Sequence, residues 1–178
     1  MANYVLKRIR QRLSECKLTL HPEKTKIVRC RDSKRDWFAD YETVSFTFLG
    51  YTFQPRKGYN LKKKEGFTTF SPAISRKATK EFGRRIRSMG LQNRTGSTLE
   101  QLAKEINRIV RGYINYFGQY RRKELHPMFF NLNLLLLKWA RRKYKLLRTS
   151  KRRAVKWLKR VAKYNPNLFA HWKFGVRP

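Results

Sequence analysis

The stretch STLEQLAKEINRIVRGYINYF, residues 97–117, decides the fold class expected for most of this chain. Its apolar residues recur at intervals of three and four, which is the period of an amphipathic α-helix. The stripe comprises Leu99, Leu102, Ala103, Ile106, Ile109, Val110, Tyr113, Ile114 and Phe117. Ser97 and Glu100 have the spacing of a capping box, so we expect the helix to begin beside them.

Neighbouring segments carry the same helical period. The sequence SPAIS, residues 71–75, offers Ser71 as an N-cap and Pro72 as the first residue of a helix that ends near Met89. Two further helices are predicted over about 125–147 and 151–163. A helical bundle is therefore expected after residue 70.

The first 70 residues follow a different pattern. Residues 3–17 predict an amphipathic helix, and residues 24–30 and 44–55 predict strands, with Gly50 at a bulge or a close backbone approach. A basic hairpin is expected around Gly58. One helix and a few strands give a thin core, so this piece is expected to be part of a larger domain.

The predicted fold class is α+β. A small, incomplete α/β piece over 1–70 precedes a predominantly α-helical bundle over 71–148, and 149–178 form a basic C-terminal helix and tail.

Charge limits the classes of partner. The 178 residues include 44 Lys and Arg but only 11 Asp and Glu, giving a net charge of +33 and a pI near 11.1. A field of this size repels itself, so a polyanionic partner is expected. No run reaches the roughly 20 apolar residues of a spanning helix, and the N-terminus lacks a secretory signal. We therefore expect a cytoplasmic protein without a membrane partner.

Metal-binding patterns are sparse. Cys16, Cys30 and His21 are too few for a structural zinc site, and Cys16 extends the apolar stripe of the first helix, which predicts a core position. Asp32, Asp36 and Asp40 lie in one polar loop among basic residues, so they are not expected to bind a metal. No metal or cofactor is predicted for this chain.

The basic residues lie on the predicted helices. From 138 to 163 there are thirteen Lys and Arg and no acidic residue, a pattern that accumulates repulsion and favours phosphate binding over a solvated face. Tyr113, Tyr116 and Tyr120 alternate with arginines and could pack, stack on bases, or do both. Gly112 and Gly118 each cost their helix about 1 kcal/mol relative to Ala, which a close helix or RNA backbone would explain.

The residues predicted to bind RNA are drawn from all these helices. They are Arg76, Lys77, Lys80, Arg84, Arg85, Arg87, Lys104, Arg108, Arg111, Tyr116, Arg121, Arg122, Lys138, Arg141, Arg142, Lys145, Arg152, Arg153 and Lys156.

Five motifs occur in order along the chain. They are LTLHPEKTKIV (18–28), FLGYTFQPR (48–56), FSPAIS (70–75), INRIVRGYINYFGQY (106–120) and LFAHWKFG (168–175). Together they resemble the C-terminal portion of a bacterial group II intron reverse transcriptase/maturase. The resemblance implies that 1–70 are the end of a polymerase palm, and that the following helices are the thumb, also called the maturase or X domain, which binds intron RNA and assists splicing.

The resemblance also implies roles for individual residues. Phe48, Leu49, Gly50 and Tyr51 would lie near the primer terminus as a grip, and Lys24 is either an accessory cation near the incoming nucleotide or a solvated turn residue. Such polymerases need paired aspartates to hold two Mg²⁺ ions, and this chain has no adjacent aspartates. We therefore predict no polymerase activity for this chain alone, with Mg²⁺ required only when the missing palm residues are supplied.

The expected partners are group II intron RNA, and in addition target DNA and a separate palm and fingers polypeptide. With such a palm the chain would support RNA-directed DNA synthesis. An alternative is a stand-alone structural RNA-binding protein of ribosomal type, whose charge neutralises rRNA. A third class, basic proteins of membrane surfaces or condensed DNA, is disfavoured by the apolar helix stripes.

Overall fold

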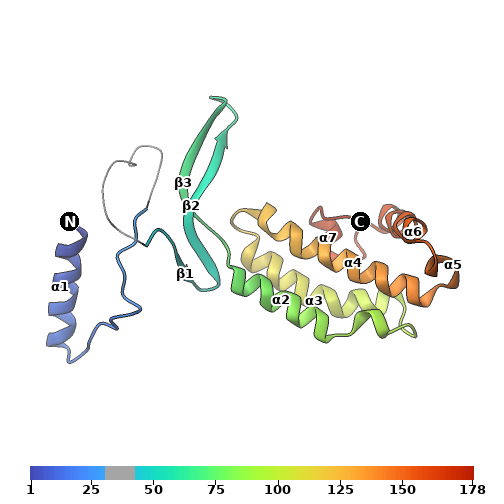
Figure 1. Ribbon diagram of the computed structural model, residues 1–178, viewed down its shortest axis with the longest axis horizontal. Helices are drawn as coiled ribbons and strands as arrows, with labels where there is room; N and C mark the ends of the chain where they lie inside the picture. Colours follow the sequence, from blue (N-terminus) through green and yellow to red (C-terminus); the bar gives the residue numbers. More distant parts are fainter. Residues whose placement is uncertain (31–42) are drawn as a thin grey trace. The chain divides into compact units, whose positions relative to one another are not determined.

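A computed structural model of the protein describes residues 1–30 and 43–178. The chain divides into two compact units, Met1–Pro72 and Ala73–Pro178 (Figure 1). Within its described residues the structure combines α-helices with one small sheet, which confirms the mixed α+β class.

The first unit contains one helix and a three-stranded sheet. Its elements are α1 (Ala2–Glu15), β1 (Phe46–Phe48), β2 (Tyr51–Asn60) and β3 (Glu65–Ile74), with β3 running on into the second unit and the strands in the order β1-β2-β3. The β1 and β2 strands are antiparallel, with Phe46 opposite Phe53 and Phe48 opposite Tyr51. The basic hairpin expected around Gly58 is formed by β2 and β3.

Gly50 lies in a turn, so the predicted bulge is wrong. The register leaves only Leu49 and Gly50 between the strands, and their φ angles are 48° and 79°. A two-residue hairpin loop with two positive φ angles matches the twist of its strands, and glycine adopts such a φ without steric cost.

The segment predicted as a strand over 24–30 is not one. Thr25 N–H donates to the His21 carbonyl (3.0 Å), which closes a turn, and Arg29 N–H donates to the Thr43 carbonyl (3.0 Å). Among the described residues no ladder extends this second bond, and an isolated bond does not make a strand.

Burial is slight in the described part of the first unit. None of the described residues from 1 to 72 is buried, and Val5 and Ile9 on the apolar side of α1 are each 46% exposed. Cys16 is also exposed, so its predicted core position is wrong. The helix has an apolar stripe, but within the described part of this unit nothing covers it fully.

The second unit is a helical bundle. Its elements are α2 (Arg76–Ser88), η1 (Leu91–Asn93), α3 (Leu99–Phe117), η2 (Arg122–Leu125), α4 (His126–Lys143), α5 (Lys145–Arg148), α6 (Lys151–Tyr164) and α7 (Ala170–Lys173). Helix α4 contacts α2, α5 and α6, and α3 contacts α7 (Figure 1). Phe82 of α2 packs edge-on against both Tyr113 of α3 and Phe129 of α4, with ring centroids 4.9 and 5.8 Å apart. The long helices therefore share one aromatic core.

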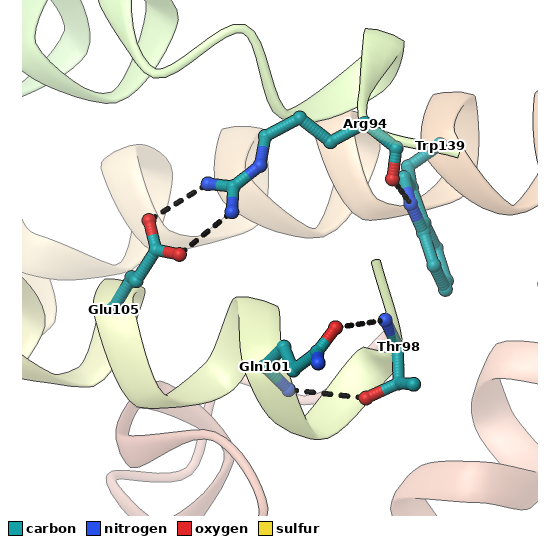
Figure 2. A network of polar contacts seen from close by, with 5 residues as sticks. All are labelled: Arg94, Thr98, Gln101, Glu105 and Trp139. Carbon is teal, nitrogen blue, oxygen red and sulfur yellow. Dashed lines mark hydrogen bonds and ion pairs between the residues drawn. The ribbon is translucent and has the colours of Figure 1, made fainter. Parts of the chain in front are cut away.

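Two predicted helix starts are displaced. Ser75 caps α2, since its Oγ accepts from Ala78 N–H (3.1 Å), while Ser71 and Pro72 belong to β3. Thr98 caps α3 in place of Ser97: its Oγ1 accepts from Gln101 N–H, and the Gln101 side chain accepts from Thr98 N–H (2.8 Å; Figure 2). Ser97 and Thr98 both fit the capping pattern, and Leu99, the first residue of the observed helix, is buried.

The helix predicted over 125–147 is interrupted at Tyr144, whose φ of −104° and ψ of 115° are extended. Its ring lies between Trp139 and Trp157, with centroid distances of 6.0 and 5.2 Å. Tertiary packing of these rings accompanies a break that no proline or glycine signals in the sequence.

Two buried asparagines hold the C-terminal segment. Asn107 of α3 donates to the Leu168 carbonyl (2.9 Å) and accepts from Ala170 N–H (2.7 Å). Asn133 of α4 donates to the Val176 carbonyl (3.2 Å), and its Oδ1 lies 2.8 Å from His171 Nε2 and 2.9 Å from Trp172 Nε1. The LFAHWKFG motif is therefore part of the core of the second unit.

Candidate nucleic-acid interface

The predicted RNA-binding residues lie on the surface of the second unit. All are exposed except Arg121 and Arg141, which are half-buried. They do not form one continuous face, because they lie in separate groups. Some of them also make hydrogen bonds or ion pairs that hold the fold.

The first group lies along α2. Arg76, Lys77, Lys80 and Arg84 line a shallow depression together with Glu81. Arg84 Nη2 lies 2.5 Å from the Glu81 carboxylate, and this hydrogen bond lowers the pKa of Glu81. The single acid of the helix is thus paired within its own element.

The second group lines an open groove between α2 and α3, which we call the α2/α3 groove. Its lining residues are Arg85, Glu105, Arg108, Ile109, Gly112, Tyr113, Tyr116 and Phe117, and its volume is about 740 Å³. Arg85 comes from α2, while Arg108 and Tyr116 come from α3. Two predicted cations and a predicted aromatic side chain therefore meet here from different helices.

The three tyrosines differ in environment. Tyr113 is half-buried against Phe82 and Phe117, and burial raises the pKa of its phenol. Tyr116 is 48% exposed and Tyr120 is 53% exposed. Packing accounts for Tyr113, whereas Tyr116 and Tyr120 present ring surface to solvent.

Glu105 is held at the edge of the α2/α3 groove by a two-pronged ion pair. Arg94 Nη1 and Nη2 each lie 2.7 Å from a Glu105 oxygen, and these bonds lower the pKa of the carboxyl (Figure 2). The Arg94 carbonyl in turn accepts from Trp139 Nε1 at 2.9 Å. The indole of α4 thereby fixes the loop that carries the arginine.

The C-terminal end of α4 also forms hydrogen bonds with the loop that carries Arg94. Lys143 Nζ donates to the Ser97 carbonyl (2.6 Å), and Arg142 donates to the Asn93 side chain. These bonds give Lys143 and Arg142 a structural role that sequence reasoning missed. Charge alone does not reveal it, because the acceptors are backbone and amide oxygens far along the chain.

The third group is wholly basic. Lys138, Arg141, Arg142 and Arg148 line a depression of about 430 Å³. Arg141 also donates from Nη2 to the Arg148 carbonyl at 3.0 Å. Cations in the last turn of a helix interact favourably with its dipole, so part of this charge stabilises α4 itself.

The first turn of α6 carries charge that its helix disfavours. Lys151, Arg152 and Arg153 occupy the first three positions after the Ser150 cap. Backbone N–H groups already make a helix N-terminus positive, and cations there are destabilising. Arg152, Arg153 and, one turn later, Lys156 are all exposed, and the helix itself gives no reason for cations at this end.

The remaining predicted cations have mixed surroundings. Lys104, Arg108 and Arg111 share one exposed side of α3. The Arg122 guanidinium lies 4.5 Å from the centre of the Phe174 ring, and Arg121 Nε lies 3.6 Å from Glu124. Arg87 of α2 and Lys145 of α5 are exposed.

In the first unit, the FLGY segment forms the tip of the β1–β2 hairpin. Phe48 is 60% exposed and Leu49 is 67% exposed, and Gly50 and Tyr51 complete the turn. Lys24 lies in the turn after Pro22, where its N–H donates to His21 Nδ1 (3.3 Å). The tip of the next hairpin carries Lys62, Lys63 and Lys64, a cationic group absent from the predicted residues.

Candidate metal ligands do not cluster in the described part of the chain. Within 1–30 and 43–178, no three His, Cys, Asp or Glu side chains come together as metal ligands. Asp32, Asp36 and Asp40 lie outside the described residues. Among the helices that the structure describes, none is long and apolar enough to cross a membrane.

Comparison with protein families gives one match. Residues 79–166 match the family model described as the group II intron, maturase-specific domain. The match begins in α2 and ends just after α6, and it supports a relation to the C-terminal part of group II intron maturases. The matched segment covers just under half of the chain. Comparisons with curated proteins and with solved structures gave no match.

Proposed function

We propose that the chain is the RNA-binding maturase portion of a group II intron reverse transcriptase, which binds intron RNA and assists its splicing. The observation that carries the proposal is a coincidence of position. The matched segment, 79–166, contains most of the cations that form the exposed groups of the second unit.

Electrostatics supports a polyanionic ligand on these helices. From 125 to 178 the sequence contains no Asp or Glu, so neighbouring cations there lack acidic partners from the same segment. Three of the four acids between 73 and 124, Glu81, Glu105 and Glu124, already face arginines. Phosphate groups of a folded RNA would relieve the remaining repulsion, and release of their counterions would drive binding.

In this proposal 1–70 correspond to the end of a polymerase palm, 71–148 to the thumb or X domain, and 149–178 to its basic C-terminal helix and tail. The exposed FLGY turn would act as a primer grip, with Lys24 as an accessory cation. A palm and fingers polypeptide would supply the carboxylates that hold Mg²⁺, and only then would RNA-directed DNA synthesis occur. Target DNA would be a further ligand of that assembly.

The test is a binding titration of the purified chain with a group II intron RNA and with an unrelated structured RNA of equal length. Both titrations are repeated across a series of salt concentrations. We expect a preference for intron RNA that persists as salt weakens both complexes. Equal affinities with equal salt slopes would contradict the proposal and favour a structural RNA-binding protein of ribosomal type.

Primer extension run beside these titrations tests the catalytic part of the proposal. With template, primer, deoxynucleotides and Mg²⁺, we expect no extension by this chain alone. Extension above the level of a boiled sample would show that the chain itself holds the catalytic metals.

A further inference from the structure

Gly112 is a residue that the fold of this protein does not require. It lies in the interior of α3, where glycine costs about 1 kcal/mol relative to Ala. Its φ is not among the positive ones. Apart from its chain neighbours and the backbone of its own helix, no heavy atom of the described residues lies within 4 Å of a Cβ added there.

Gly118 makes an instructive contrast at the end of the same helix. A Cβ there would lie 2.3 Å from the Ile114 carbonyl oxygen, so the helix end itself excludes a larger residue. The backbone of its own helix thus accounts for Gly118, whereas no atom from another described element crowds Gly112, which lines the α2/α3 groove.

The groups around Gly112 have the chemistry of a nucleotide site. Arg85 and Arg108 approach the groove from α2 and α3, and Tyr116, one turn after Gly112, offers an aromatic surface that is 48% exposed. Phosphates bind the guanidinium groups, while an unpaired base stacks on an aromatic ring. The groove volume of about 740 Å³ is within the usual range of small-ligand sites.

The acid in this groove is masked from an incoming phosphate. Glu105 accepts both guanidinium bonds from Arg94, and that pair is oriented by the Trp139 bond to the Arg94 carbonyl (Figure 2). A free carboxylate would repel a phosphate, whereas this one is neutralised by a cation outside the groove lining.

We propose that the α2/α3 groove binds an unpaired nucleotide of the bound nucleic acid. Its base stacks on Tyr116, its phosphates contact Arg85 and Arg108, and its backbone lies against Gly112, where the missing Cβ leaves room. The site rests on the proposed function for the identity of the RNA, but its chemistry suits any single strand that presents a stacked base between phosphates.

Four variants of the full chain test the site: Gly112→Ala, Tyr116→Ala, Tyr116→Phe and Arg108→Ala. A short labelled single strand, as RNA and as DNA of the same sequence, serves as the probe, and a duplex serves as competitor. Gly112→Ala should raise the unfolding midpoint in urea and weaken single-strand binding at least about three-fold. A Gly112→Ala variant that is more stable but binds the single strand more weakly would show that Gly112 serves binding. A glycine needed by the fold would instead lose stability when replaced.

The tyrosine variants separate stacking from hydrogen bonding. Stacking of one base contributes about 1–3 kcal/mol, so Tyr116→Ala should weaken binding at least about five-fold, while Tyr116→Phe should keep it within about two-fold. A probe carrying 5-iodouracil should crosslink to Tyr116 under ultraviolet light. The ratio of RNA to DNA affinity identifies which strand fills the site.

Matched controls lie outside the groove. At Gly96 an added Cβ also meets nothing within 4 Å, so Gly96→Ala should leave binding unchanged. Lys159→Ala removes one exposed cation from α6 and should weaken binding less than Arg108→Ala.

Wild-type affinity in Gly112→Ala and Tyr116→Ala would overturn the site, as would equal competition by the duplex. An intron preference that survives in those variants would leave the proposed function standing without this site. Conversely, single-strand binding that depends on Gly112 and Tyr116 without any intron preference would retain the site and contradict the proposed function.

Discussion

At the scale of single residues, the buried side chains around Asn133 show what holds the second unit together. Its Oδ1 lies 2.8 Å from His171 Nε2 and 2.9 Å from Trp172 Nε1, so one amide oxygen faces two rings of the C-terminal segment. Because the indole nitrogen can only donate, the oxygen is an acceptor and His171 donates through Nε2. His171 Nδ1 is buried without a hydrogen-bond partner. This histidine is held neutral inside the core.

His171 makes stability depend on pH. Burial lowers its pKa from 6.5 to about 3. Between these values the unfolded chain binds a proton that the folded chain does not, so the free energy of unfolding falls as pH decreases from 6.5 towards 3. The expected slope is up to about 1.4 kcal/mol per pH unit, measured by urea denaturation at several pH values.

Two variants isolate this effect. His171→Gln should remove that contribution to the slope, whereas exchange of the exposed His126 for Gln should retain it. An unchanged slope in His171→Gln would assign the acid sensitivity to other groups.

At the scale of elements, a side-chain hydrogen bond marks where each of α2, α3 and α6 begins. Two overlapping patterns, Ser97 with Glu100 and Thr98 with Gln101, both satisfy the capping rule in the sequence. The structure uses the second, with reciprocal bonds of 3.3 and 2.8 Å. The local sequence thus limited the cap of α3 to two neighbouring residues. In the structure, where Thr98 is the cap, Leu99 is buried and Lys143 donates to the Ser97 carbonyl.

The cap of α3 is testable by a matched pair of substitutions. Thr98→Ala removes the side chain that accepts from Gln101 N–H and should lower the free energy of unfolding by about 1 kcal/mol. Ser97→Ala leaves the carbonyl that Lys143 contacts and should cost less than about 0.5 kcal/mol. Urea denaturation of both variants measures the difference. Equal losses in the free energy of unfolding would argue against Thr98 as the cap of α3.

The first turn of α6 gives a second test at this scale. Arg152→Glu replaces a cation that the helix dipole disfavours, so the free energy of unfolding should rise by about 0.3–1 kcal/mol while RNA affinity falls. Lys163→Glu makes the same charge change in the last turn and should lower stability. Thermal unfolding and RNA titration of the two variants provide the comparison. If Arg152→Glu bound RNA as tightly as wild type, α6 would not contact the ligand through this turn.

At the scale of the whole molecule, the two units differ in what stabilises them. All residues in the core of the described chain lie from Ala73 onward. Residues 1–30 and 43–72 include no buried position, while Phe48, Leu49 and Val5 remain exposed. Hydrophobic burial, which dominates folding free energy, is therefore concentrated in the second unit.

This distribution predicts that a fragment of residues 73–178 folds on its own. Its unfolding in urea should be cooperative, with a midpoint close to that of the main transition of the full chain, and it should retain most of the RNA affinity. Circular dichroism and the same RNA titration measure both properties. A fragment without a cooperative transition would show that the first unit contributes to the core.

The sequence by itself determined the helical class of most residues after 75, the positions of the main apolar stripes and the cationic surface. Period and charge are local properties of the chain, and they survive in any fold that buries one side of each helix. The motifs that resemble group II intron maturases were also visible in order along the sequence, and the family match over 79–166 agrees with them at the level of the domain.

Only the tertiary structure decided which cations remain available and which hold the fold. Arg142 and Lys143 read as equivalent to Arg152 in the sequence, yet their acceptors are Asn93 and the Ser97 carbonyl, some 46–49 residues away. The break at Tyr144 and the open position of Gly112 likewise depend on side chains from other elements. These features depend on contacts between distant parts of the chain, and a local pattern contains no record of such contacts.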